Sequence, residues 1–196
     1  MKTSFSEDKE KLFAYLTIHD FFDIYTMADA LGFLQSILKA AATKKIWSKG
    51  APFRVLYYVR QLTTLCNTAF YIQENLARRD AAIIKKDKRV DNPGIEMLQA
   101  SMGKRAAETL WNSFPRHITL QQFYNPYLVI DSFCRYLPQA GWQKALEEIQ
   151  EYALLGSRIT ELHPPYNLLS IQRQLARLIE ACHLVEVRTN QVKSQK

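Results

Sequence analysis

The feature that most constrains the fold is an apolar stripe between residues 55 and 76. Apolar side chains recur there at spacings of three, four or seven residues, at Val55, Val59, Leu62, Cys66, Ala69 and Leu76. This period places them on one face of an α-helix, whereas a half-buried strand alternates every second residue. The opposite face is predicted to be polar, with Arg54, Gln61, Thr68 and Asn75. A long helix at the centre of the fold is therefore expected.

Composition supports helices in the rest of the chain. The 196 residues include 23 Leu and 19 Ala against 7 Val, and Leu and Ala lose little conformational freedom in a helix. Similar patterns predict helices from Ser6 to His19, 20–47, 92–113, 119–137, 142–155 and 168–187. The sequence thus predicts an all-α fold, a single-domain antiparallel bundle of six to eight helices over residues 1–187, followed by a polar tail at 188–196.

Several residues mark where these helices begin and end. Thr119 and Gln122 have the spacing of a capping box, in which each side chain binds the other residue's main-chain N–H. Pro126 is expected to restart or bend the helix that follows, and Pro138 to end it. Gly156 is expected to cap the next helix, because glycine adopts a left-handed conformation without steric cost.

Cysteine content and hydropathy indicate the cellular compartment in which the protein is expected. Cys66, Cys134 and Cys182 are odd in number and lie far apart in apolar segments, which predicts buried thiols in a reducing environment. The N-terminus has no apolar core of signal-peptide length, and no run of 18 apolar residues occurs. We expect a cytoplasmic protein that does not cross a membrane.

The net charge of +7 is unevenly distributed. Residues 1–38 carry a net charge of −3, residues 39–116 carry +9 and residues 117–196 carry +1. The excess is densest in six residues, which are Arg78, Arg79, Lys85, Lys86, Lys88 and Arg89. Such a cluster could neutralise phosphates of a nucleic acid or meet an acidic partner, and it is also typical of a solvated helix end.

One short motif suggests an enzyme. Arg158 precedes His163 with four residues between them, a spacing similar to the active-site motif of the HEPN superfamily of helical-bundle ribonucleases. The resemblance implies metal-independent RNA cleavage. His163 would assist proton transfer at a ribose 2′-hydroxyl, and Arg158 would stabilise the charge on phosphorus. Ile159 departs from the motif, which usually has a polar residue there.

A second alternative is a DNA-binding helix-turn-helix at residues 24–45. Gly32 would form the turn between the helices. The apolar positions of such a motif are filled by Ala28, Leu31, Phe33 and Leu38. The side chains that would face the DNA groove are Gln35, Ser36, Lys39, Lys44 and Lys45. The same span also fits one uninterrupted helix.

No metal site or cofactor is expected. His19 and Asp23 are four residues apart and could share a metal, but two ligands do not make a site. A di-metal centre in a helical bundle would need a Glu-x-x-His motif on two helices, and the chain does not carry that pair. Glycine-rich phosphate loops are also absent.

Aromatic residues point to association. The chain holds 10 Tyr, 10 Phe and 3 Trp, several of them as neighbours such as Tyr57–Tyr58 and Phe123–Tyr124. Neighbours on a helix point about 100° apart, so one of each pair is expected at the surface. The leading hypothesis is a non-catalytic protein that works by association, as a homodimer or with a protein partner. The ribonuclease and the DNA-binding regulator are the alternatives.

Overall fold

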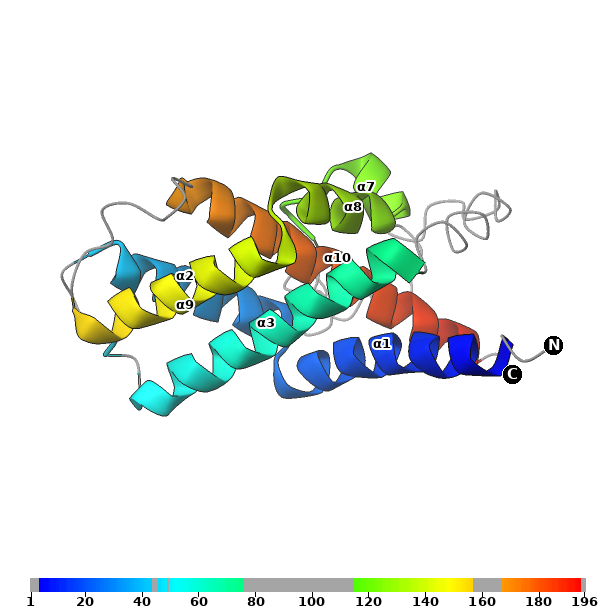
Figure 1. Ribbon diagram of the computed structural model, residues 1–196, viewed down its shortest axis with the longest axis horizontal. Helices are drawn as coiled ribbons and strands as arrows, with labels where there is room; N and C mark the ends of the chain where they lie inside the picture. Colours follow the sequence, from blue (N-terminus) through cyan, green and yellow to red (C-terminus); the bar gives the residue numbers. More distant parts are fainter. Residues whose placement is uncertain (1–3, 44–45, 49, 76–114, 157–166, 195–196) are drawn as a thin grey trace, which may run out of the picture.

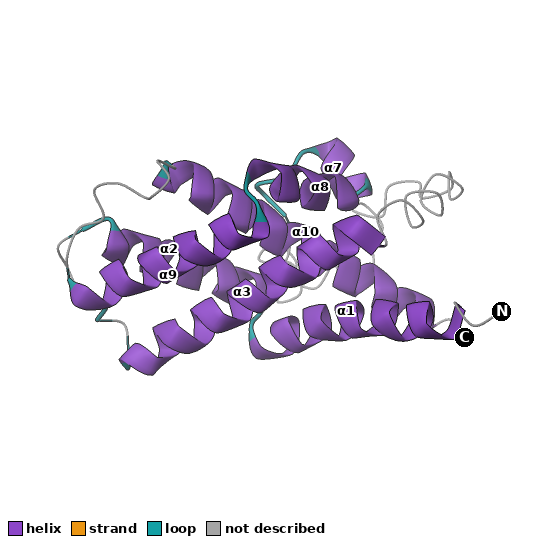
Figure 2. Cartoon of the chain, viewed as in Figure 1, coloured by secondary structure: helices purple, strands orange, loops and turns teal. Residues whose placement is uncertain are grey.

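The computed structural model describes residues 4–43, 46–48, 50–75, 115–156 and 167–194. These residues form seven α-helices and no strand, packed in one compact body, which confirms the predicted all-α fold (Figures 1 and 2). The helices are α1 (Ser4–Ile24), α2 (Met27–Ala41), α3 (Pro52–Asn75), α7 (Leu120–Tyr124), α8 (Tyr127–Tyr136), α9 (Gln139–Leu155) and α10 (Leu168–Ser194). None of them is long and apolar enough to span a bilayer, as far as the described residues go.

The predicted boundary between the first two helices is wrong. We expected one helix to end near His19 and the next to run over 20–47, but α1 continues to Ile24 and α2 begins at Met27. Thr26 makes this break, since its backbone is extended and its hydroxyl oxygen accepts a hydrogen bond from the N–H of Asp29 at 3.1 Å. The break lies inside a continuous apolar pattern, which hid it from the sequence.

The central helix α3 is confirmed. The predicted stripe from Val55 to Ala69 is buried, and α3 packs against α1, α8 and α9. The assignment of Thr68 to the polar face is wrong, because this residue is only 7% exposed. Its hydroxyl donates to the carbonyl of Thr64 at 2.9 Å, so the helix itself satisfies the polar group and the residue can face the core.

The helix boundaries predicted after residue 118 are largely confirmed. Thr119 accepts from the N–H of Gln122 at 3.3 Å and donates its own N–H to the Gln122 side chain at 3.0 Å, which is the capping box. The chain restarts as α8 after Pro126 and leaves it before Pro138. Gly156 caps α9 with a φ of 66°. α9 begins earlier than expected, at Gln139 rather than at residue 142.

Helix α10 crosses the body behind α3 and contacts α1, α2, α7 and α8 (Figure 1). Its predicted inward side chains are fully buried, namely Ile171, Leu175, Leu178, Ile179 and Cys182. The helix continues to Ser194, so the predicted tail from residue 188 is helical over most of its length. Arg188 ties this end to α7, since its guanidinium donates to the carbonyls of Phe123 and Tyr124 and lies 5.5 Å from the Phe123 ring centre.

The cysteines are free thiols in the core. Cys66 and Cys182 are buried, as predicted, and Cys134 is partly buried. Burial raises the pKa of Cys134 to about 12 and raises the pKa values of Cys66 and Cys182 as well. The thiolate is the reactive form of cysteine, so these groups are poor nucleophiles at neutral pH.

Candidate functional site

A pocket of about 320 Å³ lies between α2, α10 and the segment 115–119. One wall is apolar and comes mainly from α2. The other wall carries polar groups from the segment and from α10. The lining residues are Met27, Ala28, Leu31, Gly32, Leu34, Gln35, Arg116, His117, Gln172 and Ala176. Pockets of this size and mixed lining are where small-molecule sites are usually found.

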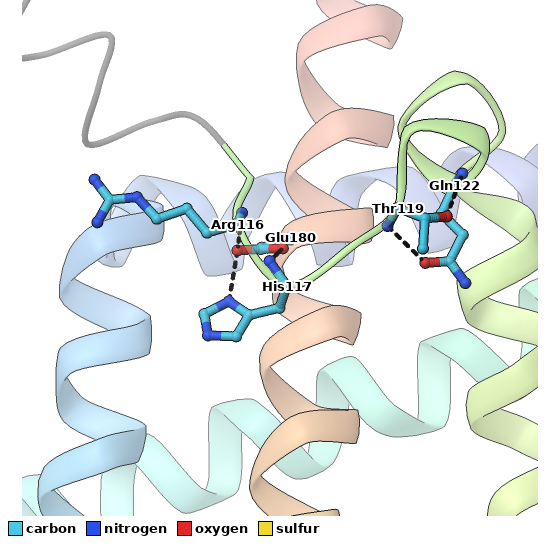
Figure 3. A network of polar contacts seen from close by, with 5 residues as sticks. All are labelled: Arg116, His117, Thr119, Gln122 and Glu180. Carbon is cyan, nitrogen blue, oxygen red and sulfur yellow. Dashed lines mark hydrogen bonds and ion pairs between the residues drawn. The ribbon is translucent and has the colours of Figure 1, made fainter.

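Glu180 fixes the segment that forms the polar wall. This glutamate lies on α10 with no exposed surface, and its carboxylate faces the segment (Figure 3). Oε1 accepts a hydrogen bond from the N–H of Arg116, and Oε2 accepts one from the N–H of His117, both at 2.7 Å. A buried carboxylate is costly unless hydrogen bonds compensate for the lost water, and these main-chain N–H groups supply them.

The same carboxylate orients the imidazole of His117. The ring Nδ1 lies 2.7 Å from Glu180 Oε1. A carboxylate accepts hydrogen bonds, so Nδ1 is the donor in this contact, and whenever the ring is neutral its lone pair lies on Nε2. The histidine is therefore held in one tautomer and one orientation, on the wall of the pocket.

Arg116 lies next to this histidine on the same wall. Figure 3 shows both side chains on the same side of the segment, while the capping box of Thr119 and Gln122 lies further along it. The capping box fixes the segment at one end and Glu180 fixes it in the middle. Both residues line the cavity, and the Arg116 side chain extends away from the His117 ring towards α2 (Figure 3).

Gly32 keeps the opposite wall open. It sits inside α2, and a Cβ atom built on it meets nothing within 4 Å. The turn that the DNA-binding alternative required at Gly32 is wrong, because α2 runs without interruption through this residue. The helix tolerates this exposed glycine because its buried residues, among them Ala30, Leu34 and Ile37, pack in the core.

A second histidine–glutamate pair joins α1 to α10. His19 Nδ1 lies 2.7 Å from Glu186 Oε1, and Nε2 lies 3.7 Å from Asp23 Oδ2. The hydrogen bond and the charge of Glu186 raise the pKa of His19. These residues do not line the pocket, and within the described ranges no group of three or more His, Cys, Asp or Glu side chains is placed to hold a metal.

A single Glu-x-x-His spacing occurs on α10, at Glu180 and His183. It is not used for a metal, since both oxygens of Glu180 bind the segment 115–119. His183 instead packs against Phe22, with ring centres 5.1 Å apart, and burial lowers its pKa. The histidine is a partly buried residue that packs at the contact between α10 and α1.

Most of the site residues predicted from the sequence cannot be placed. Arg158 and His163 lie outside the described residues, as do the basic cluster at 78–89 and the lysines at 44 and 45. The sequence reasoning missed His117 and Glu180. One signal could have found the glutamate, because it interrupts the apolar stripe of α10 between Ile179 and Cys182.

Comparison with family models, with curated proteins and with solved structures finds no match to this chain.

Proposed function

We propose that this protein binds a small organic anion in the pocket between α2, α10 and the segment 115–119. The ligand has an apolar body and a carboxylate or phosphate group. Leu31 lies on the apolar wall for this body, and Arg116 and His117 line the opposite wall, where the anionic group would bind. The planar guanidinium of arginine matches both carboxylate and phosphate in shape and charge.

The electrostatics of the pocket favour an anion. Met27 and Ala28 are the first two residues of α2, so the positive end of the helix dipole lies at the pocket wall. No acidic side chain is among the described residues that line the cavity. The negative charge of Glu180 is directed to the main chain and to the back of the His117 ring, away from the opening.

The observation that carries the proposal is the use of a fully buried carboxylate to hold this wall. Burying a carboxylate is costly unless its hydrogen bonds are satisfied. Glu180 satisfies them by binding two main-chain N–H groups and one ring nitrogen at 2.7 Å each. Precise positioning of His117 is what this arrangement provides.

Calorimetric titration with three probes tests the proposal. Benzoate and phenyl phosphate carry the anionic group, and benzamide has the same ring without charge. We expect at least one anion to bind more tightly than benzamide by about tenfold or more, the value of one charge-assisted hydrogen bond. The anion that binds better identifies the group the pocket prefers.

The variant Gly32→Leu provides the matched test of location. Gly32 is an exposed residue that lines the pocket, and a Cβ atom there meets nothing within 4 Å, so the fold should be retained while the larger side chain narrows the pocket. Binding should be lost in Gly32→Leu and kept in Gly32→Ala. Equal affinity in Gly32→Leu and the wild type would show that the ligand binds elsewhere.

We also propose, as a second function, association with another copy or with a protein partner. A row of large apolar side chains is exposed along α1, at Leu12, Phe13, Leu16 and Ile24, with Phe13 72% exposed. The other side of α1 is already buried, through Ala14, Ile18 and Phe21. Exposed apolar rows of this kind are typical of interaction surfaces.

Light scattering coupled to size-exclusion chromatography tests self-association. A dimer should have twice the 22.8 kDa of one chain, and Phe13→Ser with Leu16→Ser should return it to that mass. Asp23→Ser, at an exposed polar position of the same helix, is the control. If the wild type is a monomer at tens of micromolar, this surface does not mediate self-association, and its partner would be a different protein.

The alternatives that rest on residues outside the described ranges remain proposals. Metal-independent RNA cleavage by Arg158 and His163 would persist in chelator and disappear in His163→Ala. Nucleic-acid binding through residues 78–89 would weaken steeply with added salt. The cytoplasmic location is likewise a proposal, supported by the free thiols.

A further inference from the structure

We propose that the pocket is the active site of a hydrolase for small carboxylic esters, in which His117 is the general base. This inference rests on the proposed function, since the carboxylate that binds in the pocket would be the product of the reaction. The substrate class is an ester whose acyl part is apolar and small enough for a cavity of about 320 Å³.

The orientation of His117 is that of a general base. Its Nδ1 is occupied by Glu180 at 2.7 Å, so the neutral ring exposes the lone pair of Nε2. A carboxylate in this position holds the tautomer and stabilises the imidazolium that forms when the ring takes a proton. Here the carboxylate itself is immobilised by the N–H groups of Arg116 and His117. Glu180 is therefore a positioning residue for the base.

The nucleophile is water. No Ser, Thr or Cys is among the described residues that line the pocket, so none of these residues could form an acyl-enzyme there. His117 Nε2 takes one proton from a water molecule while the water oxygen forms a bond to the acyl carbon. The carbonyl double bond becomes a C–O⁻ single bond, and the negative charge falls on that oxygen.

Arg116 also lines the pocket, and its guanidinium would meet this charge. Cationic and N–H donors directed at a developing oxyanion are the usual means of lowering the barrier of acyl transfer. The tetrahedral intermediate then collapses. The bond from the acyl carbon to the alcohol oxygen breaks, and this oxygen takes the proton from His117 Nε2. The products are a carboxylic acid and an alcohol, and the base returns to its neutral form.

Hydrolysis of p-nitrophenyl butyrate by the full chain tests the inference. We expect His117→Gln to lower kcat by about 100-fold or more, the usual contribution of a general base, with KM nearly unchanged. The matched control is His19→Gln, which removes a histidine with the same 2.7 Å bond to a glutamate but outside the pocket. Equal rates in the wild type and His117→Gln would overturn the proposal, because free imidazole groups also hydrolyse this ester slowly.

The variant Glu180→Gln tests whether Glu180 acts by positioning the His117 ring or only by stabilising the fold. The ¹⁵N shifts of the His117 ring should report a proton on Nδ1 in the wild type and a mixture of tautomers in the variant, with a fall in kcat. If Glu180→Gln does not fold, Gly32→Leu supplies a folded variant with a narrowed pocket, and its activity should also be lost. A wild-type ring protonated on Nε2 would overturn the role of His117.

The outcomes distinguish this inference from the proposed function. Binding of benzoate without turnover of the ester leaves the binding function standing and overturns the hydrolase. Ester turnover without measurable benzoate binding supports the hydrolase and contradicts a dedicated anion-binding role. Turnover of bis(p-nitrophenyl) phosphate in place of the butyrate ester would overturn the assignment to carboxylic esters.

Discussion

Helix α10 holds two histidine–glutamate pairs that are alike in local geometry and different in setting. Glu180 binds His117 and Glu186 binds His19, each from a carboxylate oxygen to Nδ1 at 2.7 Å, and both imidazoles are 44% exposed. Glu180 has no exposed surface, whereas the Glu186 side chain is 11% exposed. Glu180 also accepts two main-chain N–H groups.

The difference lies in what each pair holds in place. His19 sits within α1, whose own hydrogen bonds already position it, so its pair adds a contact between two helices. His117 sits in a segment with no helix of its own, and Glu180 supplies the hydrogen bonds that a helix would otherwise provide. The comparison shows that an identical pair of residues stabilises a helix contact in one place and holds a non-helical segment beside the pocket in the other.

The largest expected difference between the pairs is in stability. Glu180→Ala removes the acceptor from two main-chain N–H groups and one ring nitrogen in a buried place, and should cost about 3 kcal/mol of unfolding free energy. Glu186→Ala should cost clearly less, since water can reach the groups it leaves. Urea unfolding of the two variants measures this. If both variants lost a similar amount of unfolding free energy, this would contradict the view that only Glu180 holds a main-chain segment in place.

A smaller effect is expected from the capping box beside His117. Thr119→Ala removes the side-chain oxygen that accepts from Gln122 N–H and should cost about 1 kcal/mol. The NMR signals of the His117 ring should broaden or shift, while those of His19 stay unchanged. Thr119→Ser, which keeps the oxygen, is the control and should behave like the wild type. A response in His19 alone would show that the segment is held by other contacts.

The smallest expected effect is the pH dependence of the exposed pair. Glu186 raises the pKa of His19 above its ordinary 6.5, so this pair stabilises the fold fully below pH 6.5 and loses that contribution as pH rises through the raised value. The pH dependence that His183 gives to the stability has the opposite sign. Burial lowers its pKa, so its contribution is present above pH 6.5 and is lost as pH falls below it.

Unfolding free energies measured between pH 5 and 8 separate these two slopes. Glu186→Gln should remove the loss of stability on the alkaline side of the profile. It should not reduce the acid-side loss, since that comes from burial of His183, and the charge of Glu186 opposes it by raising the pKa of His183. An unchanged alkaline slope in Glu186→Gln would contradict the role of the His19 pair.

Much of the fold could be predicted because helix formation depends on residues that are close together in the sequence. The stripe along α3, the capping box at Thr119 and the glycine cap at Gly156 each depend on residues within a few positions of one another. The break at Thr26 was missed although its capping signal is equally local, because the apolar pattern on both sides continues across it. Thr68 was misplaced for a related reason, since its hydroxyl is satisfied within α3.

The candidate site could not be predicted in the same way. His117 and Glu180 are 63 residues apart, and no spacing rule relates them. Gly32 was noticed, but as a turn rather than as the open wall of a cavity. A pocket is made by elements that meet only after packing, and each of its residues has an ordinary local role.

The order of polar and apolar residues determined that this chain forms amphipathic helices, because each turn of a helix is decided by neighbours three and four residues away. Only the tertiary structure decided that a carboxylate inside the α10 stripe would meet the N–H groups of a distant segment. The physical reason is that a buried charge needs partners to replace water, and which donors reach it depends on how the helices pack.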